Sequence, residues 1–494
     1  MNDKCNLIVS ALTATILTLA VPVLSGCVTT NPATGQQELT PFMSPQEERR
    51  IGAEEHPKML ARFGGVYDDI EIGAYVAGIG GRLVKNSELP NLEFRFTVLN
   101  SPDVNAFALP GGYVYVTRGL LALANSEAEL AGVLAHEIGH VTARHAAQRY
   151  NRAIATSLGT AILGAVVQSP GVDQLAQLGG ELFLKGFSRE QEIQADTLGV
   201  RYMSRVGYNP QAQAAFLRTL SSHSDLERVL AGRDGRDSRQ DFFATHPRTE
   251  NRVQKAIAAA QLSGAGAGAP LRREQYLERM TGLLYGDDPE QGMVRGRSFI
   301  HPGLGFAFEV PPGYRLFNTE QSVFAKGPED ALIRFDAAKK PTAADITSYL
   351  VQTWARGLAL TGVERISVNG MDAATGRASI RSAGKPADLR LVAVRFSDDK
   401  IYRLMMVTPL QVEPRVRQEL QRTTYSFRRL AQREAAGYRP FRLGVVAVQS
   451  GDTVESLAQR MPFEDYQVAR FQTLNGLSGT ARLSPGHRVK IVTD

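Results

Sequence analysis

The stretch Ser126-Glu127-Ala128-Glu129, followed by His136-Glu137-Ile138-Gly139-His140, decides the fold of the first half of the chain. Ser126 and Glu129 form a capping box, which predicts a helix that begins here and runs to about Arg149. Residues four apart lie on one face of a helix, so His136 and His140 can point two imidazoles at one metal ion. Glu137 lies between them and can reach a water on that ion. The pattern therefore predicts a zinc site on this helix.

Zinc in a catalytic site usually has three protein ligands and one open position, so a third ligand must come from elsewhere in the chain. The residues after His140 do not place Gly and His as the metzincin extension requires, and His145 is expected to point off the shared face, as a surface residue or an outer one. A second helix is predicted from about Ser188 to Arg205, and it carries Glu192 and Asp196. One of these carboxylates can bind zinc while the other accepts a hydrogen bond from a ligand histidine and fixes its tautomer.

Four motifs resemble the gluzincin family that includes HtpX, BepA, LoiP and the CAAX prenyl proteases, over about residues 40–260. They are the helix with His136 and His140, the pair Glu192 and Asp196, the stretch Thr245-His246-Pro247 with Arg252, and Asn105-Ala106-Phe107-Ala108-Leu109-Pro110-Gly111-Gly112. The resemblance implies zinc on His136, His140 and Glu192 and catalysis by Glu137. It makes Asp196 the residue that orients a ligand.

His246 and Arg252 each keep two interpretations. In BepA-like members the matching histidine can occupy the fourth zinc position and act as a brake, which would apply here if the loop folds inward. Otherwise His246 packs as a loop residue before proline. Arg252 either stabilises charge in the transition state or pairs with a carboxylate.

The N-terminus predicts export. Lys4 precedes an apolar run, Leu7–Leu24, which ends in Leu24-Ser25-Gly26-Cys27 and resembles a bacterial lipoprotein signal. Residues 1–26 would be removed and Cys27 would carry lipid, leaving no second cysteine for a disulfide. Val28, after the cysteine, favours the outer membrane. The alternative is an uncleaved anchor, because about 18 apolar residues just span a bilayer.

The chain is predicted to be an α+β multidomain protein. After a lipid-anchored tether at 27–43, a mainly helical zincin-type peptidase domain with a small sheet is expected at 44–262. Within it, 113–117 is predicted to be an edge strand that holds an extended peptide by strand addition. A Gly/Ala-rich linker and a short helix fill 263–297, and 298–430 forms an α+β domain of unknown role. The net charge of +6, without a basic-aromatic stripe, argues against nucleic acid as a partner.

Residues 444–494 are predicted to fold as strand–helix–helix–strand, which resembles a LysM domain. In that family two loops form a shallow groove for glycans that contain N-acetylglucosamine. Gly451, Asp452, Thr453 and Asn475 mark the corresponding positions. The alternative is a LysM-like fold that is used only for packing.

Together these features imply a zinc endopeptidase of the bacterial cell envelope, lipid-anchored and facing the periplasm. Its expected substrates are misfolded or unassembled periplasmic and outer-membrane proteins, with peptidoglycan as a possible further partner. Two alternatives stay open. One is a peptidoglycan hydrolase targeted by the LysM-like domain. The other is a chaperone-like assembly factor whose zinc site is self-inhibited.

Overall fold

The structure is a computed structural model that describes residues 28–40, 43–165, 186–230, 242–247, 250–262, 268–319, 322–338, 345–479 and 481–494. The chain divides into two compact units. The first combines the described part of Met1–Leu283 with Leu443–Thr493, and the second contains Leu284–Arg442 and Asp494. The predicted C-terminal domain therefore belongs to the same unit as the predicted peptidase domain.

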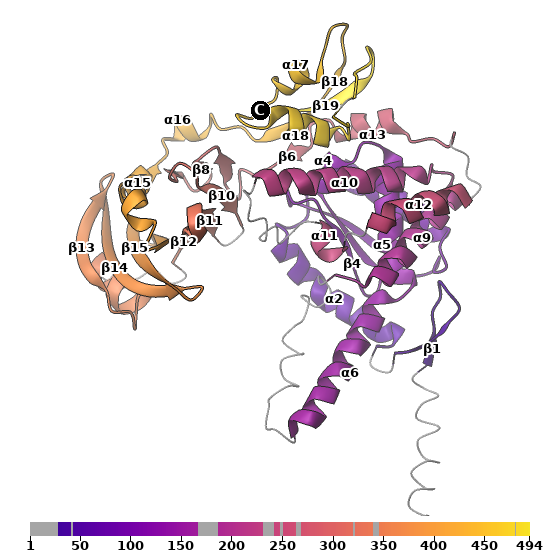
Figure 1. The fold of residues 1–494 in the computed structure, drawn as a ribbon, viewed down its shortest axis with the longest axis horizontal. Coiled ribbons are helices and arrows are strands. Elements are labelled where there is room, and N and C mark those ends of the chain that lie inside the picture. The colour runs from indigo at the N-terminus through magenta and orange to yellow at the C-terminus, as the bar shows by residue number, and fades with distance from the viewer. Residues whose placement is uncertain are drawn as a thin grey trace, which may run out of the picture. The chain divides into compact units, whose positions relative to one another are not determined.

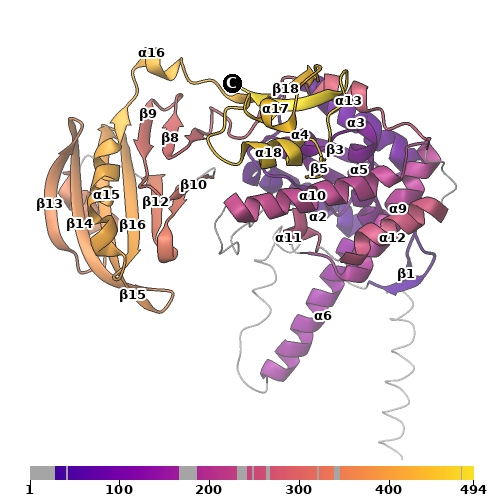
Figure 2. The same cartoon turned by 45° about the horizontal axis from the view of Figure 1, so that its top comes forward.

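The first unit is mainly helical, as predicted. Its described helices before Leu283 are α2 (Pro45–Arg62), α3 (Ile70–Lys85), α4 (Arg118–Leu123), α5 (Glu127–Thr142), α6 (His145–Ala165), α9 (Arg189–Val206), α10 (Gln211–Leu230), α11 (Phe242–Thr245), α12 (Glu250–Leu262) and α13 (Arg273–Met280). Helix α5 packs against α3, α9 and α10 (Figures 1 and 2). Its residues from Ala128 to Gly139 are almost all buried, apart from Glu129.

The two predicted helices of the site begin at their predicted caps. The Ser126 hydroxyl accepts from the backbone N–H of Glu129, and Ser188 forms a capping box at the start of α9. The first helix ends earlier than predicted, at Thr142 rather than near Arg149, because Arg144 adopts a left-handed conformation with φ of 53°. The chain bends there, and α6 leaves in a new direction.

A three-stranded sheet lies beside α5, in the order β3 (Arg95–Leu99), β5 (Tyr113–Thr117) and β4 (Ala106–Leu109). The prediction that residues 113–117 form the edge strand is wrong, because β5 pairs with β3 on one side and β4 on the other. A tight turn with positive φ at Gly111 and Gly112 folds β4 back onto β5. The free edge near α5 belongs to β4, which contacts that helix.

Part of the predicted tether is a docked hairpin of β1 (Val28–Thr30) and β2 (Gln37–Leu39). The Asn31 side chain donates to the carbonyl oxygen of Ala143 at 2.9 Å, just beyond the end of α5. Gln148 donates to Glu38 at 2.7 Å. The hairpin is thus fastened to the base of α5. Cys27 lies outside the described residues.

The second unit is built on antiparallel sheet. A seven-stranded sheet has the order β10-β11-β12-β16-β15-β14-β13, and a four-stranded sheet has the order β17-β9-β8-β7. The strands are β6 (Leu284–Tyr285), β7 (Met293–Arg295), β8 (Ser298–His301), β9 (Phe306–Glu309), β10 (Arg315–Asn318), β11 (Val323–Lys326), β12 (Leu332–Ala337), β13 (Thr361–Val368), β14 (Met371–Ser382), β15 (Lys385–Ser397), β16 (Lys400–Pro409) and β17 (Arg428–Arg429). Its helical segments are η1 (Pro328–Asp330), α14 (Ile346–Ser348), η2 (Tyr349–Trp354), α15 (Glu413–Ser426) and α16 (Gln432–Ala435). The unit begins at Leu284, ahead of the predicted boundary at residue 298.

The C-terminal segment has the predicted order of β18 (Phe441–Ala447), α17 (Val454–Ala458), α18 (Gln467–Leu474) and β19 (Arg488–Thr493). Helix α18 lies beside α10 in both views of the ribbon (Figures 1 and 2). No helix among the described residues is long and apolar enough to span a bilayer.

One buried cation fastens this segment to the helices of the first unit. The Lys490 ammonium of β19 is fully buried and donates to the carbonyl oxygens of Ala122, Leu123 and Ala124, at 2.7, 3.0 and 2.7 Å. These carbonyls end α4, where a helix leaves acceptors without partners of its own. Lys490 therefore caps α4 immediately before α5 begins.

Candidate metal centre

Helices α5 and α9 approach closely enough to bring their polar side chains to one point. A Cβ on Gly139 would lie 3.1 Å from the carbonyl oxygen of Ala195, and one on Gly199 would lie 3.2 Å from the backbone nitrogen of His136. Both distances are tighter than ordinary contact. Glycine at these two positions thus allows the helices to pack face to face.

Four side chains meet between these helices. His136, His140, Glu192 and His246 each offer a ligand atom, and these atoms all lie within 4.8 Å of one another, with every residue buried. The Nε2 atoms of His136 and His140 are 3.0 Å apart, and Nδ1 of His246 is 3.2 Å from Nε2 of His136. The structure therefore brings together the two predicted histidine ligands, the predicted Glu192 and His246.

This donor set fits a cation. Nδ1 of His136 lies 2.9 Å from Asp196 Oδ1, and Nδ1 of His140 lies 2.8 Å from Nδ1 of His145. If each Nδ1 carries the ring proton, both Nε2 lone pairs face one another at the centre, which is unfavourable unless a positive ion lies between them. Two imidazoles with one carboxylate are a common zinc set.

Asp196 is held by positive charge. Arg252 donates to both of its carboxylate oxygens, at 2.8 and 2.9 Å, and Gln213 donates to Oδ1 at 3.0 Å. Burial alone would raise the pKa of Asp196, but Arg252 outweighs it and the pKa is lowered. Arg252 also lies 2.7 Å from Glu192. Of its two predicted roles, pairing with carboxylates is the one that these contacts display.

Glu137 faces the same point and is fully buried. Among the described residues neither of its carboxylate oxygens has a hydrogen-bond partner, although Oε1 lies 3.3 Å from Nε2 of His246. Burial raises the pKa of Glu137, opposed by His246 and His136. A buried carboxylate without a donor is costly unless a ligand or water meets it. Glu137 is therefore placed to accept a proton at this centre.

The loop that carries His246 folds inward. Nδ1 of His246 lies 3.1 Å from Glu192 Oε1, and Nε2 lies 3.3 Å from the carbonyl oxygen of Ala106 on edge strand β4. The ring stacks on Phe242 at 4.5 Å. Burial lowers the pKa of His246, but the carboxylates of Glu192 and Glu137 outweigh it and the pKa is raised. His246 thus lies where a substrate would meet both the strand and the centre.

The sequence predicted His145 as a surface or an outer residue and gave Gln194 no role, and the structure excludes the surface position. His145 is fully buried, and its Nε2 lies 2.6 Å from Gln194 Oε1. If Nε2 carries the proton and donates to Gln194, Nδ1 of His145 is left as an acceptor for His140. The bend at Arg144 turns His145 back toward α5, which a continuous helix would not allow. No motif in the sequence indicates that His145 and Gln194 contact one another.

Replacing His145 with leucine is expected to weaken zinc binding by roughly ten- to a hundredfold, because His140 loses the acceptor that orients it. Competition with a chelator measures the dissociation constant. His145→Asn keeps an acceptor oxygen and should recover part of the affinity. Nitrogen chemical shifts of His140 in metal-free protein report its tautomer directly. Equal affinity in wild type and His145→Leu would contradict this role.

The predicted glycan positions do not form one exposed group. Gly451, Asp452 and Thr453 lie at the turn before α17, where the Thr453 side chain caps the helix. Asn475 is buried, and its side chain bonds to the backbone of Phe471 and Lys490. Its amide therefore supports the fold of the segment.

Comparison with known proteins agrees with the two resemblances. Residues 73–260 match the family described as Peptidase family M48, and residues 446–492 match the LysM domain. The chain is 31% identical over 200 residues to the "Beta-barrel assembly-enhancing protease" of Yersinia pestis, covering 39% of each chain. It is 35% identical over 177 residues to the "Mitochondrial metalloendopeptidase OMA1" of Arabidopsis thaliana, covering 36% of this chain and 33% of that one.

The "Beta-barrel assembly-enhancing protease" of Escherichia coli K12 is 28% identical over 264 residues, covering 51% of this chain and 52% of the relative. The chain thus spans between about a third and a half of the length of these relatives. The matched region contains every residue of the metal centre. The chain therefore carries a metallopeptidase domain of peptidase family M48, followed by a LysM domain.

Proposed function

We propose that this chain is a zinc-dependent endopeptidase of the bacterial cell envelope that cleaves misfolded or unassembled periplasmic and outer-membrane proteins. One observation carries the chemistry: a buried His136–His140–Glu192 centre with the unsatisfied carboxylate of Glu137 beside it. When bound, zinc would supply a water of lowered pKa and polarise the peptide carbonyl.

The chain's own residues divide the remaining work. Glu137 takes a proton from the attacking water at a carboxylate oxygen and returns it to the leaving amine. Asp196, fixed by Arg252, orients His136. A substrate peptide adds to the free edge of β4, where main-chain hydrogen bonds require an extended and therefore unfolded or flexible segment. This requirement favours misfolded clients over folded ones.

The envelope location rests on the predicted signal and on the LysM domain. Lipid on Cys27 and an outer-membrane position are part of this proposal, with peptidoglycan as a further binding partner through residues 451–453. The names of the relatives include beta-barrel assembly and supply the client class. Cleavage of casein and of an unfolded outer-membrane protein by purified full-length protein, with zinc content measured, tests the activity.

The inward fold of His246 also favours a self-inhibited state. His246→Ala is expected to raise kcat/KM for an unfolded protein by roughly tenfold or more, because the open state of such an equilibrium is commonly only about 0.1–10% populated. Cleavage rates with zinc content held equal measure the effect. Thr245→Ala, next to it on the same loop, serves as the matched control. A large loss of activity in His246→Ala would instead make His246 a catalytic residue.

Release of muropeptides from purified sacculi would support the peptidoglycan-hydrolase alternative. The scaffold alternative requires that cells that carry Glu137→Gln keep every function of the wild type. A self-inhibited scaffold does not explain a buried carboxylate beside three candidate metal ligands as directly as hydrolysis does.

A further inference from the structure

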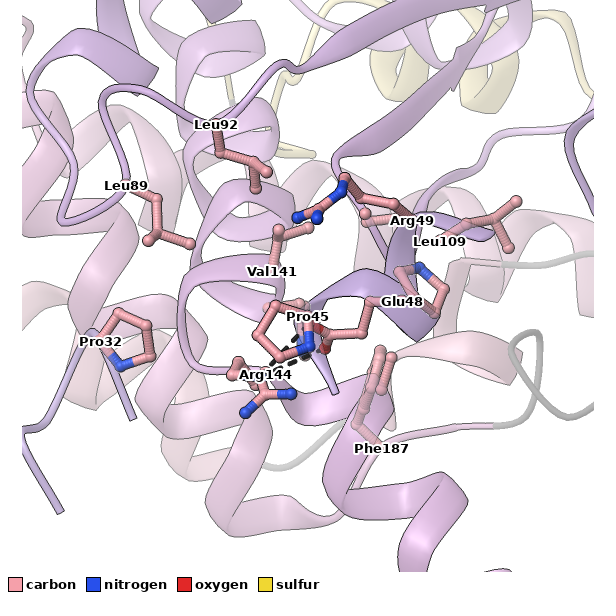
Figure 3. A pocket seen from close by; sticks show the side chains of 15 residues that line it. Pro32, Pro45, Glu48, Arg49, Leu89, Leu92, Leu109, Val141, Arg144 and Phe187 are labelled. Atoms are coloured by element: carbon pink, nitrogen blue, oxygen red, sulfur yellow. Dashed lines mark hydrogen bonds and ion pairs between the residues drawn. The ribbon is translucent and has the colours of Figure 1, made fainter. Parts of the chain in front are cut away.

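A cavity of about 270 Å³ lies beside the metal centre (Figure 3). Its wall includes His140 and the end of edge strand β4, at Ala108 and Leu109. The cavity therefore begins where an extended peptide on β4 would pass the metal ligands.

Most of the lining is apolar. Leu89 and Leu92, in the loop before β3, face Val141 of α5 across the cavity, and Phe187 closes another side (Figure 3). Leu89, Leu92 and Val141 are only partly buried. Apolar side chains that line a hollow gain free energy when an apolar group displaces water from it. An apolar ligand group is therefore the favoured occupant.

Two charged residues of the wall, Glu48 and Arg144, are paired with one another, while the third, Arg49, is exposed. Nε of Arg144 lies 3.3 Å from Glu48 Oε2, and its Nη2 donates to the carbonyl oxygen of Met43 at 2.7 Å. Burial raises the pKa of Glu48 to about 6, against the effect of Arg144. A basic substrate side chain would have to compete with Arg144 for Glu48 and would meet the guanidinium of Arg49, so the cavity disfavours basic groups.

The wall is also rigid. Gly111 follows β4 with a φ of 82°, and a Cβ there would lie 2.7 Å from the Cα of Arg49 in α2. The backbones of β4 and α2 are in contact here, so this side of the cavity cannot deform easily. A rigid hollow of fixed size selects its occupant by volume.

The geometry points to a specificity site for one large apolar side chain, of the size of leucine, methionine or phenylalanine, next to the cleaved bond of the peptide. This inference rests on the proposed function and names the residue class that it prefers. Alternate side chains of a strand point the same way, so a peptide on β4 directs one of them toward the α5 side. The volume is below the roughly 300–1,000 Å³ of pockets for drug-sized ligands and suits a single side chain.

A peptide library with one varied position around the scissile bond tests this site with full-length protein. The wild type and its His246→Ala variant should favour leucine or phenylalanine over alanine by about tenfold or more in kcat/KM. Leu92→Trp fills the cavity and should reverse this preference toward alanine. Leu92→Ala enlarges it and should shift the optimum toward tryptophan. Leu271→Trp, at a residue that is 42% exposed and outside the cavity, is the matched control.

The outcomes separate the two proposals. Cleavage with the same preference in wild type and in both Leu92 variants would overturn the specificity site and leave the peptidase intact. Absence of cleavage of every peptide by zinc-loaded wild type and His246→Ala would overturn the proposed function itself. A preference that changes equally in Leu271→Trp would also refute the assignment, because that residue does not line the cavity.

Discussion

Replacing Glu137 with glutamine is expected to lower kcat by roughly 10²–10⁴-fold, because the amide cannot take the proton of the attacking water. Zinc content should stay at the wild-type level, since the proposed ligands are His136, His140 and Glu192. The variant keeps the volume of the side chain, so the fully buried position should tolerate it. Single-turnover cleavage of casein, with metal analysis of the same sample, measures both quantities.

Asp196→Asn is the informative companion variant. It removes the charge that Arg252 neutralises and disturbs the orientation of His136, so it should weaken zinc binding as well as activity. Glu137→Gln should lose activity alone. Activity that survives in Glu137→Gln with full zinc would refute the mechanism.

Replacing Lys490 with methionine is expected to lower the free energy of unfolding of the first unit by about 1–3 kcal/mol, the cost of leaving buried acceptors without a donor. The three carbonyl oxygens at the end of α4 would lose their shared donor. Glu129, whose carboxylate acts on Lys490 from the start of α5, would lose a neighbouring cation. Calorimetry and hydrogen exchange of residues 122–130 measure the change.

Arg488→Met is the matched control on the same strand. Arg488 pairs with Glu274 at 3.6 Å, and the two side chains are 36% and 59% exposed, so its loss should cost less than about 1 kcal/mol. The chain's single tryptophan, Trp354, lies in the second unit, so its fluorescence monitors whether that unit stays folded. Equal losses in both variants would show that Lys490 has no special role.

Periodicity made the candidate metal ligands predictable. His136 and His140 share a helix face, Glu192 and Asp196 share another, and both helices carry explicit caps. The choice of Glu192 over Asp196 as the ligand came from the family resemblance. His145 lies on the same stretch of chain, but its position depends on the left-handed bend at Arg144. The polar partners of that bend, Met43 and Glu48, are about 100 residues away. A local sequence pattern cannot predict a contact between residues so far apart in the chain.

The prediction that residues 113–117 form the edge strand was wrong for a similar reason. Tyr113–Thr117 has strong strand propensity, but which strand remains unpaired depends on the pairing of all three strands. From the sequence pattern, Lys490 would also be predicted as an ordinary solvated lysine in an alternating strand. Its burial follows from the carbonyl oxygens at the end of α4, which only the folded chain presents. Residues 451–453 and Cys27 remain predictions.

The docking of Lys490 has a consequence for how the protein is made. The carbonyl oxygens that it caps are 366 to 368 residues earlier in the chain, and the whole second unit is inserted between the two partners. During synthesis from the N-terminus, residues 284–442 must emerge before β19 can reach α4. Closing so long a loop adds to the entropic cost of folding and slows it. The active-site helix therefore acquires its last support only when the chain is nearly complete, which delays a competent peptidase domain until the LysM segment has been produced.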